Sequence, residues 1–349
     1  MGRIVLVTGV SGDLGGRFAR LLSADPAVER VIGVDVVPPR GDMGDVRFVR
    51  ADIRNPVIAK VIAGEDVDTV VHMSVIATPG TAGGRTSMKE LNVIGTMQLL
   101  AACQKAPSLK RLVVRSSTAV YGSSPRDPAM FTEDMAPKRL PRSGFAKDVV
   151  EVEGYVRGFA RRRPDIEVTM LRAANTIGPT VSSPMSQYFR LPVVPTVLGF
   201  DARLQFLHED DLLHALSHAA TNGVHGTFNI AGDGILMLSQ ALRRLGKPSI
   251  PLPSFAASQV GSFVRQSRVA DFSPEQIGFL TYGRGVDTTR MRTMLGFEPT
   301  MTTAEAFADF GASLTPTGGT ATRVIDGIAR VTGTELPDPA GELTGAPRG

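Results

Sequence analysis

Three glycines near the start of the chain have the spacing of a loop that binds phosphate groups. The sequence TGVSGDLG places Gly9, Gly12 and Gly15 between an apolar run and an amphipathic one. One glycine permits the tight turn, one lets a pyrophosphate approach the backbone, and one lets helix and strand pack closely. The N–H groups at the start of the following helix, around Asp13 and Leu14, would then face the phosphates. The spacing predicts a dinucleotide site; the alternative for an isolated glycine pattern is an ordinary tight turn.

Asp35 ends the second apolar run, 20 residues after Gly15. A carboxylate at this place accepts hydrogen bonds from the ribose 2′- and 3′-hydroxyls and repels a 2′-phosphate. The residues that follow offer no immediate arginine to reverse this preference, the nearest being Arg40. The pattern therefore predicts NAD, in preference to NADP, as the cofactor.

The strands and helices that position these residues can be predicted from the sequence, in which short apolar runs alternate with longer amphipathic ones. Strand-like runs cover 4–8, 31–35, 47–49, 69–73, 112–116 and 168–172, and helical patterns cover 15–24, 56–63, 88–105 and 146–162. Such regular alternation predicts an α/β fold, a doubly wound parallel sheet covered by helices on both faces. Near-continuous apolar strands fit that burial.

After Arg172 the alternation stops. Residues 175–199 are rich in proline, serine and threonine and are expected to form a loop with little regular structure. A helix at 208–222 and one more strand at 227–231 follow. We expect residues 1–175 to form the NAD-binding domain, to which 205–232 return. A smaller C-terminal substrate lobe would comprise 176–204 and 233–314, and 315–349 would form a loose tail.

The composition is that of an ordinary globular protein. The 349 residues are 42% hydrophobic and 21% charged, with a net charge of +4. The basic residues are dispersed, and the one tight cluster, 161–163, fits a solvated helix end. The single cysteine, Cys103, excludes an internal disulfide, and no apolar run reaches the roughly 18 residues of a spanning helix. We therefore expect a cytoplasmic protein with a small-molecule substrate, no nucleic-acid partner and no membrane span.

Beyond the glycine loop, further motifs resemble those of the extended short-chain dehydrogenase/reductase family, in the same order. This family includes NAD-dependent sugar-nucleotide epimerases, dehydratases and 3β-hydroxysteroid dehydrogenases. The likeness runs from about residue 3 to residue 310 and implies a Rossmann fold. It places several residues at the cofactor. They are Asp52 and Ile53, beside the adenine ring; His72, Met73 and Ser74, along the cofactor; and Asn92, which would tie the central helix to the sheet.

The resemblance also implies substrate-binding residues. The sequence SSTAVYG resembles the family's signature at strand five, and Ser117 stands where the family keeps its substrate-binding catalytic serine. Thr118 follows it, and Asn175 belongs to a segment that resembles the entrance to the substrate cleft. In this chemistry a hydride passes between a substrate carbon and the nicotinamide. The family further implies a homodimer through the helices at 88–105 and 146–162.

The chain departs from the family at the proton-transfer group. The family uses a Tyr-x-x-x-Lys pair, in which the tyrosine exchanges a proton with the substrate hydroxyl and the lysine holds the nicotinamide ribose. Here the segment reads SGFAK, so Lys147 is kept while Ser143 stands at the tyrosine position. An alkyl hydroxyl is a poor acid or base unaided, so either another group helps or catalysis is lost. Glu133 and Asp134 are the candidates for a replacement base.

A second departure concerns the substrate. Sugar-nucleotide epimerases have an arginine that holds the pyrophosphate where this chain has Leu204-Gln205, with Arg203 one place early. Because side chains alternate faces along a strand, that shift directs Arg203 the other way. Arg284 and Arg290 are the alternatives in the C-terminal lobe.

The leading functional hypothesis is an NAD-dependent oxidoreductase or epimerase of the sugar-nucleotide epimerase/dehydratase type, acting on a hydroxyl-bearing small molecule. Its catalytic residues would be Ser117, Lys147 and Ser143. The alternatives are a catalytically degenerate NAD-binding protein with a regulatory or scaffolding role, and a reductase like the 3β-hydroxysteroid dehydrogenases. No metal is expected, because acidic residues after His208 fit the first turn of a helix.

Overall fold

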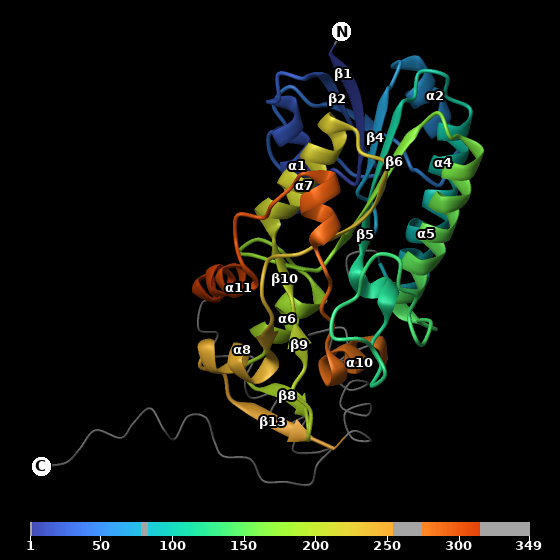
Figure 1. Cartoon of the computed structure of the whole chain (residues 1–349). Coiled ribbons are helices and arrows are strands. Elements are labelled where there is room, and N and C mark those ends of the chain that lie inside the picture. The colour runs from blue at the N-terminus through green and yellow to red at the C-terminus, as the bar shows by residue number, and fades with distance from the viewer. Residues whose placement is uncertain (1, 78–82, 254–273, 315–349) are drawn as a thin grey trace, which may run out of the picture.

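A seven-stranded sheet forms the centre of the larger part of the molecule (Figure 1). The structure is a computed structural model that describes residues 2–77, 83–253 and 274–314. The tail expected at 315–349 lies outside the described residues. The strands of the sheet are β1 (Arg3–Thr8), β2 (Val28–Asp35), β3 (Arg47–Arg50), β4 (Thr69–His72), β5 (Arg111–Ser117), β6 (Glu167–Ala173) and β11 (Gly226–Ile230).

All neighbouring strands are parallel, in the order β11-β6-β5-β4-β1-β2-β3. The chain therefore runs outward from β1 through β2 and β3, and then returns to continue on the other side with β4. In such sheets ligands bind where the order reverses, outside the carboxyl ends of the strands. The register places these ends on one edge, since Thr8 lies opposite Val34 and His72. The predicted doubly wound parallel sheet is confirmed.

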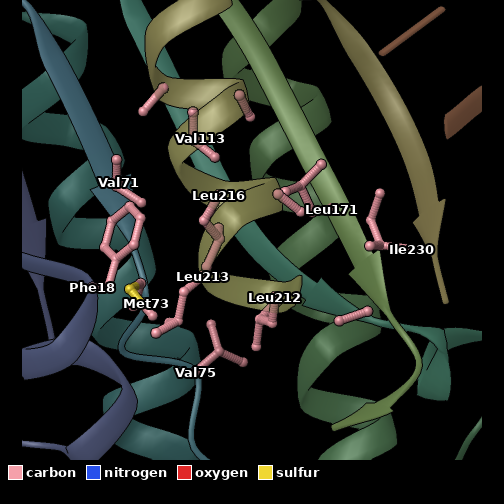
Figure 2. Packing of buried hydrophobic residues seen from close by; sticks show 14 of the residues in the cluster. Phe18, Val71, Met73, Val75, Val113, Leu171, Leu212, Leu213, Leu216 and Ile230 are labelled. Atoms are coloured by element: carbon pink, nitrogen blue, oxygen red, sulfur yellow. The ribbon is translucent and has the colours of Figure 1, made fainter. Parts of the chain in front are cut away.

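Helices cover both faces of this sheet because its strands are apolar on both sides. One layer holds α1 (Asp13–Ser23) and α7 (Glu209–Asn222), and the other holds α2 (Val57–Gly64), α4 (Thr96–Gln104) and α5 (Gly144–Arg162). Figure 2 shows α7 presenting Leu212, Leu213 and Leu216 to the strands. On the opposite face, Leu112 and Val114 of β5 pack in one cluster with Val152 of α5.

A second, smaller lobe lies beyond the carboxyl edge of the sheet (Figure 1). It pairs β7 (Asn175–Ile177) with β10 (Phe206–His208), β8 (Val194–Val197) with β13 (Ser249–Leu252), and β9 (Arg203–Leu204) with β12 (Leu236–Met237). Its helices are α6 (Pro184–Arg190), α8 (Leu238–Arg244), α10 (Pro274–Tyr282) and α11 (Thr303–Ala312), whereas η4 (Met291–Leu295) packs into the core of the larger part, against β11. A separate apolar core holds the lobe together, with the rings of Phe189 and Phe307 4.9 Å apart.

The expectation of an irregular loop at 175–199 is wrong. This segment forms β7, α6 and β8. Pro184 does not break the structure, because it occupies the first turn of α6, where the missing N–H costs nothing. Ser183 and Ser186 form a capping box at the same helix start. The helical stretch at 88–105 is also interrupted, into α3 (Arg85–Lys89), the π-helical η2 (Glu90–Gly95) and α4.

Candidate functional site

The glycine loop joins β1 to α1 at the carboxyl edge of the sheet. Gly9 has a φ of +81°, a conformation that side chains with a Cβ rarely adopt. A Cβ on Gly15 would lie 2.0 Å from the carbonyl oxygen of Gly9, so only glycine permits this close packing of helix and strand. Gly12 and Asp13 are exposed and Leu14 is half-buried. No side chain of the described residues caps α1 at Gly12, so its N–H groups suit a pyrophosphate.

The carboxylate of Asp35 lies beside this loop. Its Oδ2 accepts hydrogen bonds from the backbone N and the Oγ of Ser11, at 3.0 and 2.6 Å, and its Oδ1 accepts one from the N of Val36. The acid is therefore held at the carboxyl end of β2, next to the turn between β1 and α1. Together the loop and the acid form a cradle that fits the pyrophosphate and adenosine ribose of NAD.

Asp52 and Ile53 follow β3, and the structure gives them different surroundings. The guanidinium of Arg54 bonds the Asp52 carboxylate at 2.7 to 3.0 Å, and this hydrogen bonding lowers the pKa of Asp52. Ile53 is buried against η2, where a Cβ on Gly95 would lie 2.8 Å from its Cδ1. Asp52 is thus a partly exposed, anionic side chain, and Ile53 supplies packing.

His72 is fully enclosed at the end of β4. Thr8 Oγ1 lies 2.9 Å from its Nδ1 and Thr96 Oγ1 lies 2.8 Å from its Nε2, so both ring nitrogens are used. Burial lowers the pKa of the imidazole to about 4, which keeps it neutral at physiological pH. His72 therefore holds β1, β4 and α4 together, and Met73 and Ser74, which follow it, are also buried.

Asn92 joins η2 to the segment after β4. Its Oδ1 accepts from the N of Ile76 at 2.8 Å, and its Nδ2 donates to the carbonyl of the same residue at 2.9 Å. Nδ2 also approaches Asp148, which is fully buried and forms an ion pair with Arg85. Asn92 is fully buried and ties η2 to the loop that follows β4. Its contribution to the cofactor site stays a prediction.

Ser117 is the last residue of β5 and is half-buried. Its Oγ accepts a hydrogen bond from the N of Ala119 at 3.2 Å, as the cap of the short turn η3 (Thr118–Tyr121). Thr118 is buried, and Asn175 opens β7, half-buried, beside Phe206 of β10. Ser117 therefore lies at the same edge of the sheet as the glycine loop.

Ser143 and Lys147 occupy the start of α5. Ser143 occupies the N-cap position of this helix, but its side chain forms no capping bond there. Instead its hydroxyl donates to Oε1 of Glu275, at 2.5 Å, and its N–H donates to the same oxygen at 3.0 Å. The Nζ of Lys147 lies 3.8 Å from Glu151 on the next turn, and the lysine side chain is 43% exposed. Sequence reasoning missed Glu275, because 132 residues separate it from Ser143 and no motif marks it.

Glu133 and Asp134, the replacement bases considered from the sequence, have other partners. Glu133 is buried, its Oε1 accepts from the N of Asn229 at 2.8 Å, and Arg290 lies 4.0 Å from its Oε2. Asp134 forms an ion pair with Arg290. Glu133 thus ties the loop after β5 to β11, and Arg290, just before η4, lies against both acids.

The residues at the expected pyrophosphate position serve the fold. Gln205 is buried, with its Nε2 on the carbonyl of Gly232 and its Oε1 on the N of Val286. Arg203 binds the backbone carbonyls of Pro128 and Ala129. Arg284 comes nearer to the serine signature: it donates to the carbonyl of Gly122 at 2.7 Å.

In the described residues, no three His, Cys, Asp or Glu side chains gather in a way that would hold a metal ion. Within the same ranges, no helix combines the length and the apolar character needed to cross a membrane.

Comparisons with known proteins agree with this arrangement. An uncharacterised protein of Mycobacterium tuberculosis is 52% identical over 320 residues, covering 90% of this chain and 85% of its own. The UDP-glucose 4-epimerase of Mycolicibacterium smegmatis is 25% identical, over 87% of this chain and 96% of its own. Among solved structures, the UDP-glucose 4-epimerase of Thermotoga maritima shares the fold. Its TM-score is 0.68 at 19% identity, covering 89% of this chain and 98% of its own.

The family itself is given by the sequence model for "NAD dependent epimerase/dehydratase family", which matches residues 5–231. That range holds the glycine loop, Asp35, Ser117 and Lys147. The chain belongs to the NAD-dependent epimerase/dehydratase family, and its cofactor is NAD.

Proposed function

We propose that this protein is an NAD-dependent oxidoreductase or epimerase acting on a hydroxyl-bearing small molecule, of the sugar-nucleotide epimerase/dehydratase type. One observation carries the proposal. The NAD cradle of Gly9, Gly12 and Asp35 and the hydroxyl of Ser117 lie on one edge of the sheet, at the carboxyl ends of parallel strands. A cofactor bound along this edge would extend toward the serine.

Each residue has a defined task in this proposal. NAD, when bound, supplies the acceptor for a hydride and can return it. Ser117 would bind the reacting hydroxyl, because its Oγ accepts one backbone hydrogen bond and keeps its own proton to donate. Lys147 would hold the nicotinamide ribose, and its 43% exposure leaves the ammonium free to turn from Glu151. Thr118 and Asn175 would line the substrate side.

A turnover screen tests this proposal. Purified protein is mixed with NAD and, in turn, with sugar nucleotides, free sugars and polyols, and absorbance at the nicotinamide band is followed, with product analysis for epimers. Ser117→Ala should lower the rate on any active compound by at least tenfold, whereas Ser23→Ala should not. Ser23 ends α1 and bonds only the carbonyl of Arg20 among the described residues. Equal rates for the two variants would contradict the role of Ser117.

The second candidate, an NAD-binding protein without turnover, is favoured by one observation. Ser143 stands where the family has its tyrosine, and an alkyl hydroxyl is by itself a poor general acid or base at neutral pH. Native mass spectrometry of the purified protein distinguishes the candidates in combination with the screen. Bound NAD without turnover of any compound supports the binding protein, and bound NAD with turnover supports the enzyme.

For assembly, we propose a homodimer through α4 and α5, which lie side by side in Figure 1. Ile94, Met97 and Tyr155 are 42%, 38% and 39% exposed, a high proportion for large apolar side chains on adjacent helices. A shallow pocket between the two helices is lined by Met97, Leu100 and Tyr155, among others. A second copy of the same face would cover this apolar surface.

A further inference from the structure

Helix α10 brings a carboxylate to the position where the family has its tyrosine. Oε1 of Glu275 accepts both the hydroxyl proton of Ser143, at 2.5 Å, and its N–H, at 3.0 Å. Oε2 of Glu275 is buried and bonds no group in the described residues. One oxygen of the carboxylate thus accepts hydrogen bonds from Ser143, and the other is available to accept a proton.

The packing of α10 places this carboxylate at the candidate site. One turn after Glu275, a Cβ on Gly278 would lie 3.7 Å from the carbonyl oxygen of Ser123. Just beyond α10, Arg284 donates to the carbonyl of Gly122, at the end of the serine signature. The helix therefore packs against two segments at once, the one that follows Ser117 and the one that begins α5 with Ser143.

The start of α5 favours an anion. The unpaired N–H groups and the dipole of a helix stabilise negative charge at its N-terminus, and α5 is a helix of 19 residues. The Ser143 side chain forms no capping bond with α5. The negative charge near this helix N-terminus comes instead from Glu275, on α10. Other acids near the cleft are engaged elsewhere: Glu133 with Asn229, and Asp134 with Arg290.

We propose that Ser143 and Glu275 together replace the missing tyrosine, Ser143 contacting the substrate hydroxyl and Glu275 accepting the proton through it. The step balances as the oxidation of an alcohol. As the substrate carbon gives its hydride to NAD, the substrate O–H proton passes to Ser143 Oγ, and the proton of Ser143 passes to Glu275. A C=O bond forms, and NADH and a protonated Glu275 result. The reverse transfer reduces the carbonyl. This inference rests on the proposed function.

Glu275→Gln separates a proton acceptor from a structural cap. The amide oxygen of glutamine still accepts the two hydrogen bonds of Ser143 but takes up no proton. On a compound that the wild type turns over, we expect kcat to fall by about 100-fold or more, since positioned acid–base groups contribute about 10²- to 10⁴-fold. The low-pH limb of the rate profile should disappear, while NADH affinity and melting temperature stay within error. Glu298→Gln, an exposed acid, is the matched control. Retention of more than a third of the rate by Glu275→Gln would overturn the proposal.

A second readout needs no substrate and keeps the inference separate from the proposed function. Ser143→Cys places a thiol against Glu275, and the neighbouring carboxylate should raise the thiol pKa. The native thiol, Cys103, adds no background, because it is fully buried and burial raises its pKa to about 12. Alkylation by iodoacetamide at pH 7 should be about tenfold slower in Ser143→Cys than in Ser143→Cys with Glu275→Gln. Equal rates would show that no anionic carboxylate faces position 143 and would overturn the pairing. Slow alkylation without turnover of any compound would instead contradict only the proposed function.

Discussion

Ser11 donates two hydrogen bonds to one oxygen of Asp35, from its N at 3.0 Å and from its Oγ at 2.6 Å. The glycine loop and the acid of β2 are thereby joined before any ribose binds. The carboxylate has a fixed place and orientation, and we predict that its charge lies where a 2′-phosphate would come.

We therefore expect NAD(H) to bind at least tenfold more tightly than NADP(H), which corresponds to about 1.4 kcal/mol. Titration calorimetry with both cofactors measures the ratio. Asp35→Ala should narrow it, because the repulsion of the 2′-phosphate is removed. Asp45→Ala, an exposed acid of the following loop, should leave it unchanged. Equal affinities in the wild type would contradict the role of Asp35.

UDP-glucose and UDP-galactose should be poor ligands despite the similarity to their epimerases. Gln205 is buried and bonds Gly232 and Val286, so it offers no cation to a pyrophosphate. A missing charge-assisted bond costs about 1.5–3 kcal/mol. Saturation-transfer NMR or calorimetry with both nucleotides provides the measurement. Micromolar binding would show that another arginine, with Arg284 the nearest candidate, holds the pyrophosphate, and Arg284→Ala would then abolish it.

Ser143→Tyr should lower the turnover of the wild type. The larger side chain cannot keep the bond to Oε1 of Glu275 and would obstruct the cleft beside α10. Initial rates with saturating NAD give the comparison. If the protein has merely lost its proton-transfer group, the same substitution rebuilds the family pair with Lys147 and the rate rises. A rise would therefore support the degenerate protein and oppose the role given to Glu275.

His72 should make the fold less stable in acid. Its folded pKa of about 4 lies below the unfolded value of 6.5, so between these values the unfolded chain binds more protons. Stability should therefore be complete above about pH 6.5 and fall as the pH drops toward 4, by roughly 3 kcal/mol. Urea unfolding at several pH values measures this slope. The His72→Asn variant should be less stable at pH 7, but its free energy of unfolding should fall less steeply with decreasing pH. Equal pH dependence in the variant and the wild type would contradict the low pKa assigned to His72.

The proposed dimer can be tested on the face formed by α4 and α5. Met97→Glu places a charge in the apolar surface and should shift a dimer toward monomer by at least tenfold in dissociation constant, because a charge is costly to bury without a partner. Sedimentation velocity across a concentration series measures the change. Met294→Glu serves as the control, since Met294 is 57% exposed but lies in η4. A monomeric wild type would rule out the dimer.

The larger part of the fold could be predicted because its signals are local. Strands such as β1 and β4 are continuous apolar runs, and the glycines at 9 and 15 are required by a turn and a close contact. The prediction of a loop at 175–199 is wrong because Pro184 starts a helix as readily as it interrupts one. The boundaries of the two lobes stay predictions.

The candidate site likewise has a part that could be predicted from the sequence and a part that could not. Asp35 and Ser117 follow strands directly, so their places at the sheet edge could be inferred from the chain order. The contact between Ser143 and Glu275 joins α5 to α10 across 132 residues, and no spacing rule connects them. The burial of Glu133 and Gln205 depends likewise on packing between the lobes.

The edge strand β11 is the last strand of the sheet to be synthesised, well after its neighbour β6. Six strands of the sheet are complete at Ala173, but β11 is reached only at Gly226, after much of the second lobe. Until then one edge of β6 in the nascent chain has no strand to hydrogen-bond with. Such an unpaired edge can pair with a strand of another chain. With β11 in place, Oδ1 of Asn229 accepts a hydrogen bond from the Tyr121 hydroxyl at 2.8 Å, and the backbone N of Asn229 donates to Oε1 of Glu133, also at 2.8 Å. The last strand thus completes one edge of the sheet and also holds the loop that contains Glu133, so a chain truncated before residue 226 would lack both.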